Sequence, residues 1–402
     1  MTDLANKRLV LGMTGGVACY KIAELVRRLT EQGAQVDVVM TEAATHFITA
    51  VTMQALSGRH VYVDAWDSRM ANNMPHIDLT RGADLVLIAP ASADFMAKLA
   101  HGMADDLLST LCLARPCPLA VVPAMNREMW EKPATQRNVA QLADDGVAIF
   151  GPASGDQACG ETGNGRMLEP AEILADVTSA LSEKFLAGAR ILMTAGPTSE
   201  PIDPVRLLTN RSSGKTGYAL AQAAQRAGAK VTLVSGPTAL TAPRGVRTLQ
   251  VTTARQMHDA VMAHAAGADI FIGVAAVADW HVTNAAEHKL KKNAAADNVP
   301  AIQFAPNPDI LADVAALPQG PWCVGFAAET EQLETHAEAK RRRKNIPLLV
   351  GNLAQDVMDA DDTRLILFDD QGMHPLAPAS KTQAALTLLR EVALRWQADR
   401  SR

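Results

Sequence analysis

The sequence has 402 residues, which at roughly 150 residues per domain suggests two or three domains. Lys and Arg number 38 against 43 Asp and Glu, a formal net charge of −5, so no cationic surplus exists to neutralise a phosphate backbone and no nucleic-acid partner is expected. A hydrophobic share of 48% excludes wholesale disorder, and an aromatic share of only 4% favours helices packed on buried parallel strands over a β-sandwich.

The start of the sequence is polar, and no apolar stretch approaches the ~20 residues that a membrane span needs. We therefore expect no signal peptide, no membrane partner and a cytoplasmic location. The cysteines form no C-x-x-C pair, so we expect neither a zinc site nor a disulfide framework but reduced thiols. These cysteines are Cys19, Cys112, Cys117, Cys159 and Cys323.

The first half of the chain opens with a short apolar run at residues 8–13, which predicts a buried strand. The small-residue turn Thr14-Gly15-Gly16 and a helical pattern over residues 17–31 follow it. Further apolar runs predict strands, and residues 171–185 predict the closing helix of this half. The predicted strands are residues 36–40, 85–89 and 119–122.

The second half opens in the same way. Residues 190–195 predict a strand, which runs into the turn Gly196-Pro197-Thr198, and residues 214–227 predict a helix. The other predicted strands are residues 230–234, 270–274 and 323–326. Repeated strand–turn–helix–strand units predict an α/β fold of two doubly wound, mostly parallel, three-layer domains, residues 1–189 and residues 190–402.

Ligands of such folds bind at the carboxyl ends of the strands, and several polar turns of the first half fall there. Gly15, Gly16 and Val17 open a helix, where bare amides can hold a phosphate, although a plain tight turn explains them equally well. The segments 92–95 and 105–108 can cap helices or contact a phosphorylated cofactor. Asn126 can cap a helix or donate to a carboxylate.

A glycine-rich loop, residues 156–167, carries the thiol of Cys159 among small polar residues. Buried cysteines are usually inert, but this composition favours an exposed flap, whose thiol could deliver a proton inside a closed site. His76 alone would be read as a surface histidine.

Four motifs occur in order, and together they closely resemble the flavin-dependent cysteine decarboxylases, the phosphopantothenoylcysteine decarboxylases in particular. They are His76-Ile77-Asp78-Leu79, Ala89-Pro90-Ala91-Ser92-Ala93, Pro123-Ala124-Met125-Asn126, and the stretch from Ala158-Cys159-Gly160 to Gly165-Arg166-Met167. Several members of that family have Asn after Ser-Ala in the second motif, where this sequence has Asp94. The departure concerns only the contact made by that side chain.

The resemblance implies a flavodoxin-like first domain that binds FMN. It implies that His76 assists oxidation of a cysteinyl substrate, that Asn126 holds the substrate carboxylate and that Cys159 reprotonates the product. Oxidation beside the carboxylate provides an electron sink for decarboxylation, and the reduced flavin later returns the hydride. The implied FMN contacts are Gly15, Gly16, Val17, Thr41, Ser92, Ala93, Asp94, Phe95, Asp105, Asp106, Leu107 and Leu108.

Two features of the second half, a glycine-lysine turn and two cationic runs, do not by themselves indicate a binding site. Ser213-Gly214-Lys215-Thr216 lacks the glycine that a Walker loop requires at position 209, which is Thr209, although an anion at this helix start stays open. The cationic runs 289–292 and 340–344 are by default solvated, the second on an exposed helix face.

A second set of motifs looks like the bacterial, CTP-using phosphopantothenate–cysteine ligases, across nearly all of residues 190–402. The motifs include Thr194-Ala195-Gly196-Pro197-Thr198, Ile202-Asp203-Pro204-Val205-Arg206, Asn210-Arg211-Ser212-Ser213-Gly214-Lys215, Ala276-Val277-Ala278-Asp279-Trp280, Asn307-Pro308-Asp309-Ile310-Leu311 and Gly325-Phe326-Ala327-Ala328-Glu329-Thr330. With the first half, the chain resembles the fused bifunctional enzymes of coenzyme A biosynthesis from end to end.

That family activates 4′-phosphopantothenate with CTP through an acyl-cytidylate, which the amine of L-cysteine then opens. The resemblance implies that Lys289 stabilises activation, that Asn210 contacts the acyl intermediate and that Arg206 supports that loop. It implies Mg²⁺ or Mn²⁺, with Asp279 as the candidate ligand, because a triphosphate needs a divalent cation. The implied CTP contacts are Gly273, Val274, Ala275, Asp279, Lys289, Asn307, Pro308, Asp309, Ile310, Phe326, Lys340 and Lys344.

The resemblance also implies a homo-oligomer of trimeric flavin domains and dimeric ligase domains, which together could form a dodecamer. Two rival hypotheses remain open. One is a flavin-binding regulatory subunit of the same fold without turnover. The other is a nicotinamide dehydrogenase, which the absence of G-x-G-x-x-G disfavours.

Overall fold

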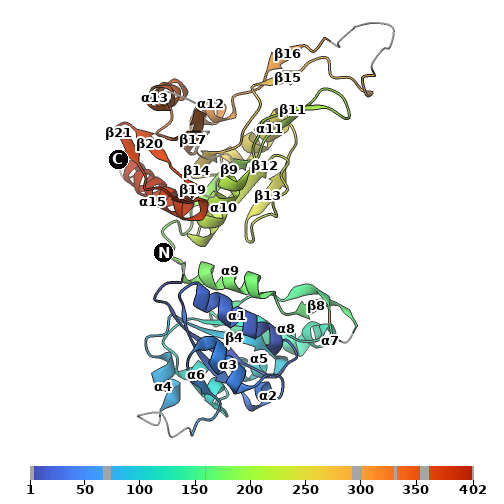
Figure 1. Cartoon of the computed structure of the whole chain (residues 1–402), viewed down its shortest axis with the longest axis vertical. Helices are drawn as coiled ribbons and strands as arrows, with labels where there is room; N and C mark the ends of the chain where they lie inside the picture. Colours follow the sequence, from blue (N-terminus) through green and yellow to red (C-terminus); the bar gives the residue numbers. More distant parts are fainter. Residues whose placement is uncertain are drawn as a thin grey trace. The chain divides into compact units, whose positions relative to one another are not determined.

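The computed structural model describes residues 4–66, 74–158, 160–291, 301–329, 333–353 and 362–400. The chain forms two compact units, Met1–Ser182 and Glu183–Arg402 (Figure 1). Each unit has its own hydrophobic core on both faces of a central sheet. Each therefore has the three-layer organisation that was predicted.

The first unit is built on a parallel sheet in the order β3-β2-β1-β4-β5-β6. These strands bury aliphatic side chains on both faces, which explains why they appear in the sequence as continuous apolar runs rather than alternating patterns. Their bounds are β1 Arg8–Met13, β2 Gln35–Met40, β3 Val61–Tyr62, β4 Leu85–Ala91, β5 Leu119–Pro123 and β6 Ala148–Ile149.

Helices cover both faces of this sheet. The side chains of α1, α3 and α9 pack into one core cluster, and those of α4, α5, α6 and α8 pack into the other. A glycine-rich hairpin, β7 Ala153–Asp156 with β8 Thr162–Arg166, lies outside the main sheet. The helices are α1 Cys19–Glu31, α2 Glu42–Thr45, α3 Ala50–Ser57, α4 Pro75–Thr80, α5 Ala93–Ala100, α6 Leu107–Ala114, α7 Arg127–Glu131, α8 Pro133–Asp144 and α9 Pro170–Leu181.

The second unit repeats the same strand order and extends it, as β13-β12-β9-β14-β17-β18-β20-β21. The first six of these strands are parallel, and β20 and β21 are antiparallel. Their bounds are β9 Arg190–Ala195, β12 Lys230–Ser235, β13 Arg247–Gln250, β14 Ile270–Gly273, β17 Trp322–Glu329, β18 Leu348–Leu353, β20 Ile366–Asp369 and β21 Gly372–Pro375.

Helices α10 and α15 pack on one face of this sheet, and α11, α12 and α13 pack on the other. Their bounds are α10 Lys215–Arg226, α11 Ala254–Ala265, α12 Ile310–Ala315, α13 Leu333–Lys344 and α15 Lys381–Arg400. Short antiparallel pairs stand apart from the main sheet. They are β10 Ser199–Pro201 with β11 Leu207–Thr209, β15 Trp280–Val282 with β16 Phe304–Pro306, and β19 Asp362–Thr363 with β22 Ala379–Ser380.

The predicted fold class is confirmed, since both units are doubly wound, mostly parallel and three-layered. The closing helix predicted over residues 171–185 ends earlier, at Leu181. The backbone becomes extended at Ser182, and Leu186 and Ala189 beyond it pack into the core of the second unit rather than continuing the helix.

Candidate functional sites

A cavity of about 530 Å³ opens at the carboxyl ends of β1, β4 and β5 in the first unit. The strand order reverses between β1 and β4, which is where ligands of doubly wound sheets bind. Predicted residues that line this cavity are Gly15, Gly16, Val17, Ser92, Ala93 and Asn126. These residues come from the three turns that follow β1, β4 and β5, which the sequence analysis had considered as ligand contacts.

Thr14 ties two of these walls together. Its buried hydroxyl donates to the carbonyl oxygen of Pro90 at 2.7 Å and accepts from the amide of Ser92 at 2.9 Å. Ser92 in turn caps α5, since its hydroxyl accepts from the amide of Phe95. Within the described residues, the amides of Gly15, Gly16 and Val17 donate to no protein atom. They are thus available to an anion at the start of α1.

Two cations line the same cavity and share one carboxylate. Lys21 is only 9% exposed, and its Nζ lies 2.7 Å from Oε1 of Glu169. Nη2 of Arg166 lies 2.8 Å from the same oxygen. The hydrogen bonds from Lys21 and then Arg166 hold the pKa of Glu169 below its usual value. Asp156 also lines the cavity, so the two cations are matched by two carboxylates, and the backbone amides at the start of α1 stay the anion-binding feature of this site.

Asn126 lies at the start of α7, where its Oδ1 accepts from the amide of Glu128. Its Nδ2 donates to Oε2 of Glu161 at 2.6 Å. The hairpin β7–β8 lies against this loop, because the amide of Met125 donates to the carbonyl oxygen of Gly165 at 2.9 Å. The glycine-rich stretch, predicted as a flap, is thus a hairpin that forms part of the cavity wall.

The other predicted residues of the first unit that the structure describes do not line this cavity. His76 lies on α4, Thr41 caps α2, and Asp94 is exposed on α5. Cys159 lies outside the described residues, but its neighbours Gln157 and Ala158 line the cavity.

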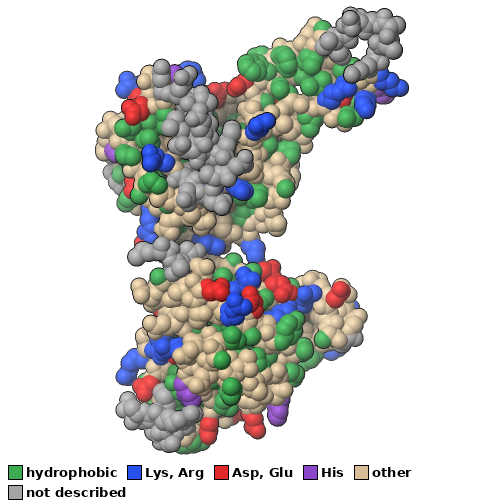
Figure 2. Space-filling model, in the orientation of Figure 1, with side chains coloured by type: hydrophobic (Ala, Val, Ile, Leu, Met, Phe, Trp, Pro, Cys, Tyr) green, Lys and Arg blue, Asp and Glu red, His purple; other side chains and the backbone are tan. Residues whose placement is uncertain are grey.

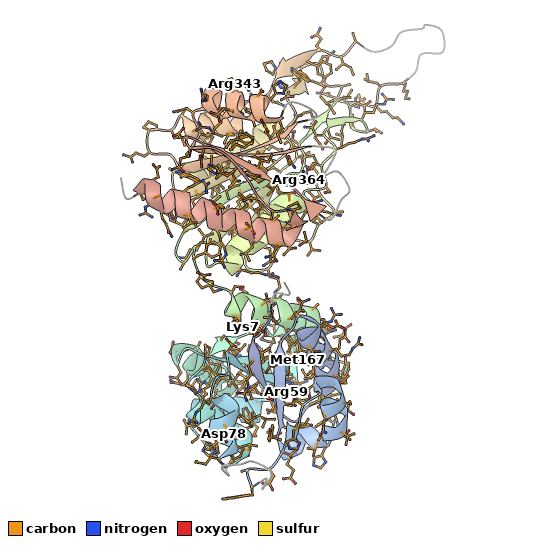
Figure 3. All side chains as sticks on the ribbon, turned by 60° about the vertical axis from the view of Figure 1, so that its left-hand side comes forward. Lys7, Arg59, Asp78, Met167, Arg343 and Arg364 are labelled. Atoms are coloured by element: carbon orange, nitrogen blue, oxygen red, sulfur yellow. The ribbon has the colours of Figure 1, made fainter. Side chains whose placement is uncertain are left out.

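Other predicted contacts serve the fold through their side chains. Phe95, Leu107 and Leu108 are at most 2% exposed in the core, Asp105 pairs with Lys98 at 2.8 Å, and Asp106 caps α6. Because the side chains of Phe95, Leu107 and Leu108 are buried, these residues could contact a ligand only through their backbone atoms. Lining residues that the sequence reasoning did not single out include Tyr20, Lys21 and Met129. Arg166 and Met167, the latter labelled in Figure 3, also line the cavity and belong to the fourth motif of the first half.

The second unit has its own strand reversal, between β9 and β14. Thr194, at the end of β9, is buried, and its hydroxyl accepts from the amides of Val274 and Ala275, both at 3.2 Å. Nδ2 of Asn210 donates to the carbonyl oxygens of Ala276 and Val277, both at 3.1 Å. The predicted residues Asn210 and Gly273–Ala275 therefore lie at one edge of the sheet.

Residues 279 and 307–309 are joined through the backbone. The amide of Asn307 donates to the carbonyl oxygen of Asp279 at 2.8 Å. Oδ1 of Asp309 caps α12, which begins at Ile310, and lies 2.7 Å from Nζ of Lys344. Burial opposes ionisation of Asp309, but the hydrogen bonds from Lys344 and from the amide of Ala312, together with the positive charge of Lys344, outweigh it, and the pKa of Asp309 is lowered.

Lys340 lies one turn before Lys344 on α13, and its Nζ donates to the carbonyl oxygen of Phe326 at 3.2 Å. Most residues predicted to contact CTP are thus connected along the carboxyl ends of β14 and β17, which pair through Gly273 and Gly325. Lys289 is the exception, because the backbone of the next residue, Leu290, is bonded to Asp203 and Arg206 of the β10–β11 turn.

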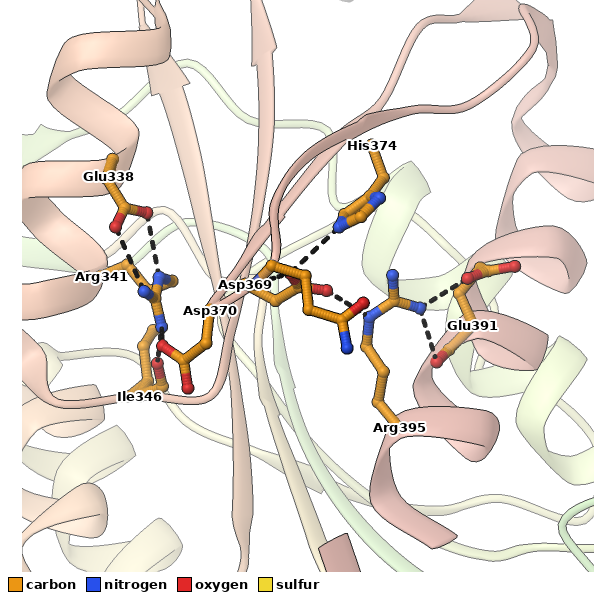
Figure 4. A network of polar contacts seen from close by, with 9 residues as sticks. Glu338, Arg341, Ile346, Asp369, Asp370, His374, Glu391 and Arg395 are labelled. Carbon is orange, nitrogen blue, oxygen red and sulfur yellow. Dashed lines mark hydrogen bonds and ion pairs between the residues drawn. The ribbon is translucent and has the colours of Figure 1, made fainter. Parts of the chain in front are cut away.

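The prediction of an exposed cationic face on α13 is wrong for Arg341, which is 7% exposed. Its guanidinium lies between Glu338, 3.0 Å away, and Asp370, 2.9 Å away (Figure 4). The preceding residue, Asp369, contacts His374 and Arg395 of α15. Asp369 ends β20 and Asp370 lies in the turn to β21, two strands that the sequence analysis did not predict.

Among the described residues, no group of three His, Cys, Asp or Glu side chains could hold a metal ion, and the predicted ligand Asp279 is exposed. The described cysteines are free thiols, and burial raises the pKa of Cys112 and Cys323 to about 12. None of the helices in the described ranges is long and apolar enough to cross a membrane.

Comparison with known proteins assigns each unit. The family model "Flavoprotein" matches residues 1–182, and the model "DNA/pantothenate metabolism flavoprotein C-terminal domain" (DFP) matches residues 186–395. The Coenzyme A biosynthesis bifunctional protein CoaBC of Vibrio cholerae is 49% identical over 393 residues, covering 97% of this chain and 98% of that protein. The chain belongs to this family.

The CoaBC protein of Escherichia coli is 47% identical over 399 residues, which cover 98% of both chains. A crystal structure of a CoaBC C-terminal domain is 36% identical, with a TM-score of 0.46, and covers 54% of this chain and 100% of that one. The prediction of a bifunctional enzyme of coenzyme A biosynthesis, with phosphopantothenoylcysteine decarboxylase and phosphopantothenate–cysteine ligase activities, is confirmed by the family. The first unit is a flavoprotein unit.

Proposed function

We propose that residues 1–189 bind FMN in the 530 Å³ cavity and decarboxylate 4′-phosphopantothenoyl-cysteine. We propose that residues 190–402 make this intermediate from 4′-phosphopantothenate, L-cysteine and CTP. The observation that carries the proposal is the position of the cavity, at the strand reversal of a unit that the flavoprotein family model matches.

The residues around the cavity fit a flavin mononucleotide. The free amides at the start of α1 suit its phosphate, and the apolar walls formed by Ala124, Met125 and Met129 suit an aromatic ring. Bound there, FMN would supply reversible hydride acceptance, which would give the electrons of the leaving carboxylate a sink in the oxidised cysteinyl group.

The chain's own residues then orient the substrate and move protons. The contact between Asn126 and Glu161, at 2.6 Å, supports a carboxylate-binding role for Asn126, because its amide already donates to a carboxylate. Cys159 follows two lining residues in the hairpin and would supply the proton that completes the product. His76 would assist the oxidation step.

In the second unit, the carboxylate of 4′-phosphopantothenate attacks the α-phosphate of CTP and pyrophosphate leaves. The amine of cysteine then attacks the acyl carbon and CMP leaves. Lys289, Lys340 and Lys344 would neutralise phosphate charge, and Asn210 would contact the acyl group, with Arg206 supporting its loop.

Mg²⁺ or Mn²⁺ would bind mainly through the phosphates of CTP, with Asp279 as a single protein contact. The exposed position of Asp279 outside any metal-binding cluster of the described residues supports this arrangement. Magnesium is commonly held by one or two carboxylates together with substrate phosphates.

We further propose that the ligase units dimerise through the hairpins β10–β11 and β15–β16. Hydrophobic side chains gather over these hairpins in Figure 2. Trp280 is 56% exposed, and Val205, Leu207 and Phe304 are also exposed. A second copy of the chain, in a homo-oligomer that also has trimeric flavin units, would cover this apolar surface.

The test is incubation of the purified protein with 4′-phosphopantothenate, cysteine, CTP and magnesium, followed by mass analysis. We expect 4′-phosphopantetheine, carbon dioxide, CMP and pyrophosphate, together with a flavin absorption spectrum. A protein that stays colourless after reconstitution with FMN, or that consumes no CTP, would contradict the corresponding half of the proposal.

A further inference from the structure

Asp203 lies in the turn between β10 and β11, and its carboxylate is almost fully buried, at 1% exposure of the residue. Oδ1 accepts from the amides of Val205 and Arg206, both at 2.8 Å. Oδ2 accepts from Nη1 of Arg206 at 3.0 Å and from the amide of Leu290 at 3.1 Å. Two of these contacts shape the local turn, but the last reaches a segment 87 residues away.

Both backbone groups of Leu290 are held by this ion pair. Its amide donates to Asp203, and its carbonyl oxygen accepts from Nη2 of Arg206 at 3.1 Å. A further backbone bond, from the amide of Ala286 to the carbonyl oxygen of Ile202 at 3.0 Å, joins the same two segments. Residues 286–290 are therefore attached to the β10–β11 turn at three points.

Lys289 immediately precedes the held residue and is exposed. A lysine side chain is a flexible stem of four carbons, and fixing it costs up to about 2 kcal/mol of free energy in lost conformational entropy. An anchored backbone at the next residue limits the positions that its ammonium group can reach. The anchor requires an ionised carboxylate, and the donors around Asp203 outweigh its burial and keep its pKa below the usual value.

We propose that Asp203 is a positioning residue of the ligase reaction: with Arg206 it holds the backbone at Leu290 so that Lys289 faces the phosphates during activation by CTP. The inference rests on the proposed function, in which Lys289 serves the activation step. Asp203 touches neither substrate nor cofactor in this scheme and acts through Lys289.

The primary variant is Asp203→Asn, which keeps the shape of the side chain. One oxygen can still accept from Val205 and Arg206, but the amide nitrogen in place of Oδ2 cannot accept from Leu290. A matched control is Asp269→Asn. Asp269 likewise accepts from a backbone amide and a guanidinium, both of Arg190, but joins the starts of β9 and β14 at the other end of the sheet.

The full chain, reconstituted with FMN, is assayed for pyrophosphate release with 4′-phosphopantothenate and CTP, and separately for CMP release when cysteine meets the preformed intermediate. We expect Asp203→Asn to slow pyrophosphate release by about 10- to 100-fold, as small misplacements of a reacting group do. CMP release and decarboxylation should be unchanged, and Asp269→Asn should change each rate by less than about twofold.

A double-mutant cycle separates positioning from general damage. If Asp203 acts through Lys289, adding Asp203→Asn to Lys289→Gln should alter pyrophosphate release by less than about twofold. If instead the two substitutions slowed pyrophosphate release independently, so that the double variant showed the product of the two single effects, the inference would be overturned. Hydrogen exchange at Leu290 should become faster in Asp203→Asn but not in Asp269→Asn, and unchanged exchange would also overturn it.

If Asp203→Asn fails to fold, Leu290→Pro removes the same donor and leaves the Asp203–Arg206 ion pair intact. It should slow the same step, and wild-type pyrophosphate release from that variant would refute the inference. Failure of the proposed function is distinct, since the unmodified chain would then release no pyrophosphate from CTP, or Lys289→Gln would be fully active.

Discussion

Gly165 offers a direct test of the idea that the hairpin β7–β8 shapes the flavin cavity. This glycine has a backbone φ of +113°. A Cβ at this position would lie 2.6 Å from the carbonyl oxygen of Met125 and 3.3 Å from that of Asn126. Carbon and backbone oxygen do not approach so closely, so Gly165→Ala must push the hairpin away from the loop that holds Asn126.

The magnitude follows from two contributions. A residue with a side chain in such a sparsely populated backbone conformation costs about 1–3 kcal/mol. Moving the hairpin also breaks the 2.9 Å bond from Met125 to Gly165, worth about 0.5–1.5 kcal/mol net. A total near 3 kcal/mol should lower the melting temperature of the first unit by about 6–12 °C.

The assays are thermal unfolding followed by flavin fluorescence, and decarboxylation measured beside CTP-dependent pyrophosphate release in the same preparation. We expect Gly165→Ala to lose stability and decarboxylation but to keep its ligase rate. The matched control is Gly146→Ala, which also has a positive φ, +79°, but has no atom within 4 Å of the added carbon. If the two variants had equal melting temperatures and decarboxylation rates, the inferred contact between hairpin and loop would be refuted.

Cys159→Ala should still bind FMN but accumulate an oxidised, decarboxylated intermediate, detectable by mass spectrometry; a normal yield of product would exclude the proton-donor role. Lys289→Gln should slow pyrophosphate release from CTP at unchanged decarboxylation, and an unchanged ligase rate would count against its assignment. Burial opposes ionisation of Asp369, but the hydrogen bonds from Arg395 and His374 hold its pKa below the usual 3.8. The ionised carboxylate therefore stabilises the fold above pH 3.8, and this stabilisation is lost as the pH falls through the lowered pKa. The melting temperature of Asp369→Asn should accordingly fall less steeply with decreasing pH than that of the unmodified chain. Thr194→Val should destabilise the second unit by about 1–3 kcal/mol for each amide left without an acceptor, whereas Thr194→Ser should be close to neutral in thermal unfolding.

The buried strands of both sheets could be predicted from the sequence because parallel strands covered on both faces are continuous apolar runs. The predictions for residues 8–13 and 190–195 match β1 and β9 residue for residue. The short hairpins were not predicted, since β10–β11 and β15–β16 have three residues per strand and depend on tertiary partners rather than on a local pattern.

The candidate sites were partly predictable for a similar reason. Turns after buried strands can be located from the sequence, and Gly15, Ser92 and Asn126, which follow such strands, all line one cavity. Side chains that reach the site from elsewhere could not be found this way. Lys21 lies on the first turn of α1, where a lysine in an amphipathic helix normally faces solvent. Its position at the cavity becomes evident only from the structure, in which it contacts Glu169.

The two units use one structural device at their strand reversals. Thr14 directly follows β1, and Thr194 lies near the end of β9. Each threonine is buried, and its hydroxyl accepts hydrogen bonds from backbone amides just after the neighbouring strand, β4 or β14. The sheet separates there because the connections run to opposite faces, which leaves backbone donors beyond the last ladder bond without partners. A buried hydroxyl satisfies those donors and fixes the distance between the two turns while leaving the cleft open. The polar residue in each opening motif is therefore explained by the geometry of the reversal. The glycine that follows it is explained by close packing, because a Cβ on Gly15 would lie 2.7 Å from Cβ of Ala43 and one on Gly196 would lie 2.8 Å from Cγ2 of Thr238.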